Sequence, residues 1–169
     1  NNSMLASIII ITKNQKRFLE KSLPAIFNQS YKNFEVIVVD SGSTDGALEL
    51  LKNYPVKIVQ IPSVAPWEFN FATALDQGIR HARGDIIISL SGDAVPADDN
   101  WLKTVIVEFK NPQVAVVYGR YILGPKTSLY DKIQNWYFWY LMRGKKKILK
   151  NGADILGASY GFRRSLWEK

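Results

Sequence analysis

Two kinds of segment alternate along the chain. Residues 7–12 (SIIIIT) and 34–39 (FEVIVV) are short runs of mainly β-branched residues, a pattern typical of strands buried on both faces. Residues 16–28 instead place apolar side chains at helical spacing, with Pro24 expected to kink or restart the helix. By these criteria we predict strands at residues 7–12, 34–39, 56–61, 85–91 and 114–122, and helices at residues 16–28, from a cap at Ser43 or Thr44 to Leu51, and at residues 69–83, 100–109 and 129–142.

This alternation predicts an α/β domain with a Rossmann-like, mainly parallel central sheet flanked by helices. We expect residues 1–169 to form a single domain, with residues 1–3 ahead of Met4 left over from cloning. Parallel strands present their carboxyl ends on one edge of the sheet, where ligands bind in such folds. Thr12, Asp40 and Asp93 each follow or end a predicted strand, so they should gather on that edge.

Composition removes several kinds of chemistry. The chain has 47% hydrophobic residues, so a packed core is expected. It has no cysteine, which excludes disulfides, thiolate metal sites and a cysteine nucleophile. His81 is the one histidine and lies between arginines in a helical pattern, so a histidine-based zinc site or catalytic triad is not expected. No GxxxxGK[ST] loop is present, which argues against an ATPase.

The chain is basic, with a formal charge of +7 and a pI of about 9.5. The one dense cluster, residues 143–150 (RGKKKILK), follows an aromatic-rich predicted helix. No nucleic-acid-binding motif accompanies it, so we expect no nucleic-acid partner. A membrane-surface contact is a second possibility for this segment, but helically spaced aromatic residues more often pack in a core, and the packed alternative is favoured.

One acidic window runs against this composition. From Asp85 to Leu102 there is no lysine or arginine, although the window holds four aspartates. A diphosphate about 4 Å from an isolated carboxylate would be repelled by roughly 4 kcal/mol at an effective dielectric constant near 20. A divalent cation reverses that sign, and carboxylate oxygens suit Mg²⁺ or Mn²⁺. The window, with oxygen ligands at Asp85, Asp93, Asp98 and Asp99, is therefore consistent with a cation that holds phosphates.

Four blocks of the sequence resemble a known family. The runs ASIIIITKN, FEVIVVDSGSTDG, ARGDIIISLSGDAVPADDNWL and LGASYGFRRSLWE are similar, in order and spacing, to the blocks of family 2 glycosyltransferases of the GT-A fold. The resemblance implies transfer of a sugar from a nucleoside-diphosphate donor to an acceptor hydroxyl, with inversion and with Mn²⁺ or Mg²⁺ as cofactor. The VVDSGSTDG and SGDAVP runs lean toward the rhamnosyltransferase-like branch.

The resemblance also implies roles for individual residues. Ser91-Gly92-Asp93 stands at the DxD triplet, whose first acid is missing here, and a segment that often carries an Arg-Asn pair has Leu75 and Asp76 instead. The implied assignments are Thr12, Asp40 and Ser91 for the nucleotide, Asp93 for the metal, and Gly157 and Ala158 for the acceptor side. Asp98 and Asp99, by contrast, are expected to cap the helix that follows.

The catalytic base is not identified within the chain. The family places it beyond the block that ends at Lys169, and Asp154 is a poor substitute, so we expect this chain to bind a donor but to transfer little sugar. The expected partners are a UDP- or dTDP-sugar and a saccharide or lipid-linked acceptor, in the cytoplasm or at the cytoplasmic membrane face. A non-catalytic nucleotide-sugar-binding module of the same fold remains the alternative.

Overall fold

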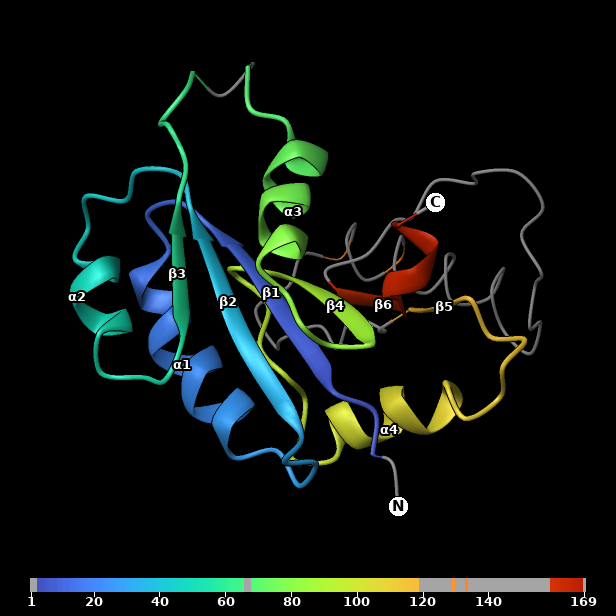
Figure 1. The fold of residues 1–169 in the computed structure, drawn as a ribbon. Coiled ribbons are helices and arrows are strands. Elements are labelled where there is room, and N and C mark those ends of the chain that lie inside the picture. The colour runs from blue at the N-terminus through green and yellow to red at the C-terminus, as the bar shows by residue number, and fades with distance from the viewer. Residues whose placement is uncertain (1–2, 66–67, 119–128, 130–132, 134–158, 169) are drawn as a thin grey trace. The chain divides into compact units, whose positions relative to one another are not determined.

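A computed structural model describes residues 3–65, 68–118, 129, 133 and 159–168. Its sheet has the order β3-β2-β1-β4-β6-β5, in which β3, β2, β1 and β4 are parallel and β6 is antiparallel to both β4 and β5 (Figure 1). This mainly parallel sheet confirms the predicted α/β class. The strands are β1 (Ala6–Thr12), β2 (Phe34–Asp40), β3 (Lys57–Gln60), β4 (Ile86–Ser91), β5 (Val116–Tyr118) and β6 (Ser159–Arg163), and the helices are α1 (Lys16–Phe27), α2 (Ala47–Leu51), α3 (Phe71–Arg80), α4 (Trp101–Glu108) and the 3₁₀ helix η1 (Arg164–Leu166).

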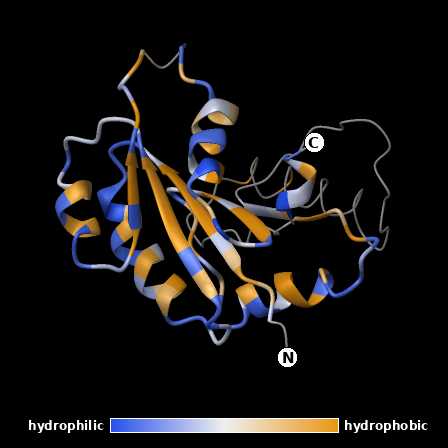
Figure 2. Cartoon of the chain, viewed as in Figure 1, coloured by the Kyte–Doolittle hydropathy of each residue, from blue (hydrophilic) through white to orange (hydrophobic). Residues whose placement is uncertain are grey.

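Helices cover both faces of the sheet. Ile8 and Ile10 of β1 face one layer, where they share a core with apolar residues of α1, α2 and α4. Ile9 and Ile11 face the other layer and share a core with α3. The β-branched runs are therefore buried on both sides, as predicted from their lack of alternation, and Figure 2 shows hydrophobic residues along the length of the central strands.

Two predicted helix features are corrected by the structure. A single helix, α1, continues through Pro24, so the predicted restart is wrong, while the kink given as the alternative stays a prediction. Glu20 is exposed, so water can bond to the carbonyl that receives no N–H from Pro24. The cap of α2 is not Ser43 or Thr44, because this short helix begins at Ala47 after Gly46. Those two side chains bond instead to Asn14 in the loop after β1, where Ser43 Oγ accepts from Asn14 N and Thr44 Oγ1 donates to Asn14 Oδ1.

The start of α4 is also capped differently from the prediction. Asn100 occupies the cap position and makes no side-chain cap bond. Asp98 Oδ1 accepts from Asn100 N at 2.8 Å, while the buried Gln29 accepts from Leu102 N, also at 2.8 Å. The helix N-terminus is thus satisfied by a residue far away in the sequence, and the side chains of Asp98 and Asp99 do not cap it.

Hydrogen bonds to Glu35 connect the starts of β1 and β2 to the loop before β4. Glu35 accepts from Ser7 Oγ at 2.7 Å and from Arg83 N at 2.6 Å, and its second oxygen pairs with Arg83 Nε at 3.1 Å. Partial burial alone would raise the pKa of Glu35. The hydrogen bonds from Ser7 and Arg83 outweigh it, so the pKa of Glu35 lies below its ordinary value.

The segment at residues 159–168 is hydrogen-bonded to the chain at the end of α4. Arg163 donates to the carbonyls of Phe109 (2.8 Å) and Asn111 (2.9 Å) at the end of α4.

Residues 1–119 and 158–169 form one compact unit and residues 120–157 a second, and all the elements named above belong to the first. Both units lie within the single domain predicted for residues 1–169, which stays a prediction. Most of the helix predicted at 129–142 lies outside the described residues.

Candidate nucleotide-binding site

The predicted edge of the sheet brings the expected residues together. Thr12 is opposite Asp40 in the register of β1 and β2, and Ile11 is opposite Ser91 in the register of β1 and β4. Neighbouring strands lie about 4.8 Å apart, so the ends of β2, β1 and β4 form one continuous row. We call this row, Thr12, Asp40 and Ser91 with the loops that follow them, the rim. These residues lie side by side because their strands are parallel neighbours in the sheet.

Asp40 is the one fully buried carboxylate at the rim. Its Oδ1 accepts from Gly42 N at 3.0 Å and from Ser43 N at 2.9 Å, which closes the turn after β2. Gly42 has a φ of 85°, a conformation that a residue with a side chain rarely adopts. The other oxygen, Oδ2, is buried and has no hydrogen-bond partner among the described residues. A buried acceptor of this kind is costly unless a ligand satisfies it.

The side chain of Gln15 lies against both Thr12 and Gly92. The Thr12 hydroxyl donates to Gln15 Oε1 at 3.2 Å, and Gly92 N donates to Ile11 O at 3.0 Å. A Cβ placed on Gly92 would lie 2.0 Å from Gln15 Oε1 and 3.0 Å from Thr12 Oγ1. The ends of β1 and β4 are therefore in close contact, with the Gln15 side chain at their junction.

Asp93 lies exposed just after β4. Its Oδ1 accepts a short hydrogen bond from the hydroxyl of Ser91. No group of three or more carboxylates or histidines forms a ready metal cage in the part of the chain that the structure describes. An exposed carboxylate fits a hard cation that takes its remaining ligands from substrate phosphates and water, which is the usual mode of Mg²⁺. The donor set at Asp93 is therefore compatible with a shared, substrate-dependent cation.

The loops of the rim after β1 and β2 are joined by polar contacts that were not predicted from the sequence. Asn14, whose φ is 52°, donates its N–H to Ser43 Oγ at 2.9 Å and accepts from Thr44 N at 2.7 Å. Asp45 accepts from Lys16 N at 2.8 Å and from Ala47 N at 3.0 Å, so one carboxylate serves the N-termini of both α1 and α2. An aspartate next to Gly46 before a helical pattern is a turn signal that could have indicated this role.

A lysine connects the rim to the loop after β3. Lys13 Nζ donates to Ser63 Oγ at 2.9 Å and to Val64 O at 3.2 Å. The same Ser63 packs on Gly42, where an added Cβ would lie 2.7 Å from Ser63 Cβ. The loops after β1, β2 and β3 thus form one connected surface beside Asp40.

Residues that depart from the family pattern have structural partners. Leu75 is buried against the sheet. Asp76 forms an ion pair with Arg80 at 2.8 Å and accepts from Trp167 Nε1 at 3.1 Å, which attaches α3 to the segment after β6. Both side chains therefore serve the packing of α3 within the described residues.

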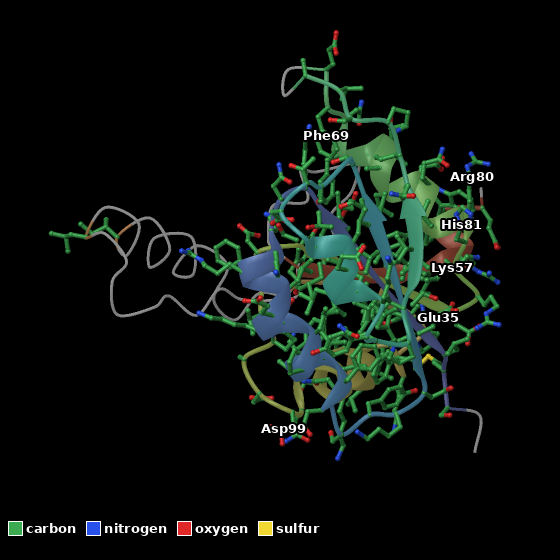
Figure 3. All side chains as sticks on the ribbon, turned by 90° about the vertical axis from the view of Figure 1, so that its left-hand side faces the viewer. Glu35, Lys57, Phe69, Arg80, His81 and Asp99 are labelled. Atoms are coloured by element: carbon green, nitrogen blue, oxygen red, sulfur yellow. The ribbon has the colours of Figure 1, made fainter. Side chains whose placement is uncertain are left out.

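Several predicted residues are away from the rim or outside the described structure. Asp99 lies at the opposite end of the molecule from Phe69, which precedes α3 at the end where the parallel strands terminate (Figure 3). Asp154, Gly157, Ala158 and the basic cluster at 143–150 lie outside the described residues, so their predicted roles stay predictions. Among the helices that the structure describes, none is long and apolar enough to cross a membrane.

Together, the fold and the rim define a mainly parallel α/β domain with a ligand edge suited to a nucleotide. Residues 7–169 match the model of the family described as glycosyl transferase family 2. The chain belongs to this family, which confirms the resemblance seen in the sequence. The rhamnosyltransferase-like branch stays a prediction.

A sequence relative agrees with this assignment, and two solved structures share the fold. The chain is 28% identical over 159 residues to a dolichol-phosphate mannosyltransferase of Pyrococcus furiosus, covering 91% of this chain and 40% of that protein. Its fold resembles a mannosyltransferase from Pyrobaculum calidifontis in complex with GDP-Man and Mn²⁺ (TM-score 0.73, 24% identity, 96% of this chain and 45% of that one). It also resembles S. aureus TarS in complex with UDP-GlcNAc (TM-score 0.62, 21% identity, 75% and 37%). The chain thus spans less than half the length of each of these three proteins.

Proposed function

We propose that this chain supplies the donor half of an inverting glycosyltransferase, which transfers a sugar from UDP or dTDP to the hydroxyl of a saccharide or lipid-linked acceptor. The observation that carries the proposal is the buried Asp40 Oδ2, which lacks a partner among the described residues. Uracil and thymine each present a ring N–H group that can donate a hydrogen bond to this oxygen. Membership of family 2 and the position of Asp40 at the rim support the same conclusion.

The rim divides the donor into a base end and a phosphate end. Asp40 at the end of β2 would bind the base, and Thr12 on the neighbouring strand would contact the base or ribose. Ser91 could offer its hydroxyl to the ribose, although that hydroxyl donates to Asp93 in the structure. Asp93 would hold Mn²⁺ or Mg²⁺ together with the diphosphate, and the bound cation would stabilise negative charge on the departing nucleoside diphosphate.

The residues of this chain then prepare the donor for attack. Anchoring the base at Asp40 and the diphosphate near Asp93 fixes the donor at both ends, which orients the anomeric carbon for the acceptor hydroxyl. The hydroxyl oxygen forms the new bond to that carbon as the bond to the diphosphate oxygen breaks. The acceptor's proton passes to a carboxylate base that the described residues do not identify. Attack opposite the leaving group inverts the configuration at the anomeric carbon.

A base panel tests the assignment of Asp40. UDP and dTDP should bind in the presence of Mn²⁺, measured by calorimetry, because each carries a ring N–H next to a carbonyl. CDP and ADP should bind at least about tenfold more weakly, because their corresponding ring nitrogens carry no proton and would face the carboxylate. Equal affinity for UDP and CDP would contradict the proposed base contact. GDP also carries such an N–H, so a preference for GDP would change the donor and leave the role of Asp40 intact.

A further inference from the structure

The two hydroxyls at the ends of β1 and β4 are already in use as donors. The hydroxyl of Thr12 donates to Gln15, and that of Ser91 donates to Asp93. Leu75 fills the position where relatives often carry an arginine, and it is buried. A diphosphate held beside Asp93 therefore needs a hydrogen-bond donor from another residue.

Gln15 has such a donor. Its Oε1 accepts from Thr12, while no hydrogen bond from its Nε2 to any described residue is present. The side chain is half-buried at the junction of β1 and β4, next to the turn that carries Asp93. An amide N–H at this position is neutral, so it adds a hydrogen-bond donor and no positive charge. This agrees with the window from Asp85 to Leu102, which has no lysine or arginine.

Gly92 makes room for this side chain. The two described glycines with positive φ are Gly42 and Gly46, so the backbone of Gly92 does not itself require glycine. A Cβ at Gly92 would collide with Gln15 Oε1 at 2.0 Å and with Ile11 O at 2.9 Å. Gly92 is the middle residue of the Ser91–Asp93 triplet, and the Gln15 side chain occupies the space that a side chain there would need.

We propose that Gln15 is a donor-binding residue whose Nε2 donates to a phosphate oxygen of the nucleoside diphosphate, while its Oε1 occupies the space that a side chain at Gly92 would otherwise fill. This inference rests on the proposed function. The Thr12 hydroxyl fixes the amide by donating to Oε1, which leaves the NH₂ group for the ligand. A hydrogen bond to a charged phosphate is stronger than one between neutral groups.

Two substitutions separate phosphate binding from a structural role. Gln15→Ala removes both amide functions, whereas Gln15→Glu keeps an acceptor for Thr12 and replaces the N–H donor with a carboxylate. With Mn²⁺ present, both variants should bind UDP about tenfold or more weakly than the wild-type chain, and both should bind uridine within about twofold of wild type. Calorimetry gives the UDP affinity, and competition against UDP gives that of uridine. Gln113→Ala is the matched control, since Gln113 is exposed just before β5, which runs parallel to β4 and so begins at the opposite edge of the sheet.

The outcomes distinguish the inference from the proposed function. If wild type binds UDP and Gln15→Glu binds it equally well or more tightly, Gln15 acts only through Thr12 or as a metal ligand, and the inference is wrong while the proposed function stands. If uridine binding falls as much as UDP binding, the phosphate contact is likewise wrong. If the wild-type chain binds none of UDP, dTDP and GDP, the proposed function fails and the inference fails with it.

A double substitution tests the link to Gly92. Gly92→Ala should weaken UDP binding by displacing the Gln15 side chain, and in the Gln15→Ala background the same change should cost at least about threefold less, because the displaced group is already gone. Thermal unfolding of each variant confirms that it is folded. Equal losses in the two backgrounds would show that Gly92 and Gln15 act independently and would overturn the proposed match between them.

Discussion

Replacing Asp40 with asparagine tests the base contact with the smallest change in shape. The side-chain oxygen of asparagine can still accept from Gly42 N and Ser43 N, so the turn after β2 is preserved. The amide nitrogen then takes the place of Oδ2, the buried oxygen without a partner. A donor would face the ring N–H of the base where an acceptor stood before.

The size of the effect follows from the burial of Asp40, which is 0% exposed. A hydrogen bond to a charged group is worth about 1.5 to 3 kcal/mol, and a desolvated one lies toward the upper end of that range. Asp40→Asn should therefore weaken binding of UDP and of uridine by the same factor, about 10-fold to 150-fold at 25 °C. The ratio of UDP affinities with Mn²⁺ and with chelator should stay at its wild-type value, since Asp93 is unchanged.

Asp93→Asn supplies the contrast for the calorimetric assay. Asp93 is exposed and lies at the end of β4, so this change should remove the metal dependence of UDP binding while uridine binding stays within about twofold of wild type. Two opposite loss patterns are expected, one for the base end and one for the phosphate end. If the two variants lose uridine and metal dependence together, the assignment of these carboxylates to separate roles is wrong.

Two further predictions concern stability, measured by urea unfolding. Glu35→Gln should lower the free energy of unfolding by about 1 to 3 kcal/mol at pH 7. Since the folded pKa of Glu35 lies below its ordinary value of 4.5, this stabilisation is present above that pH and is lost as the pH falls through the folded pKa; a deficit that persists unchanged at pH 2.5 would contradict the account. Asp45→Ala should cost about 1 to 2 kcal/mol, because Lys16 N and Ala47 N both lose their acceptor. An equal loss in Asp99→Ala, whose exposed side chain has no hydrogen bond among the described residues, would refute that role.

The parallel sheet could be predicted because its evidence is local. Ile8 to Ile11 and the matching run in β2 are buried on both faces, and such strands leave a continuous apolar run in the sequence. The convergence of Thr12 and Asp40 followed from the strand order of a parallel sheet. The role of each rim residue then came from the resemblance to the family.

Features that depend on contacts between distant segments could not be predicted. Gln29 caps α4 from 73 residues away, so the aspartates just before that helix looked like its natural caps. Asp45 bonds to Lys16 across the rim loops, and no spacing rule links the two positions. Gln15 gave no signal in the sequence, because its proposed role depends on its contact with Gly92, which lies in the turn after β4 and is far from Gln15 in the sequence.

The central claim is that this chain binds a nucleoside diphosphate through a divalent cation held at Asp93. Thermal unfolding with UDP or dTDP, each with Mn²⁺ and with chelator, tests it most directly. At a ligand concentration of about 100 times Kd, binding stabilises the folded state by about 2.7 kcal/mol, which corresponds to a rise in Tm of roughly 5 to 10 °C for a chain of this size. We predict that rise with Mn²⁺ and almost none with chelator. An equal rise under both conditions would contradict the metal role, and no rise with either nucleotide would contradict the claim as a whole.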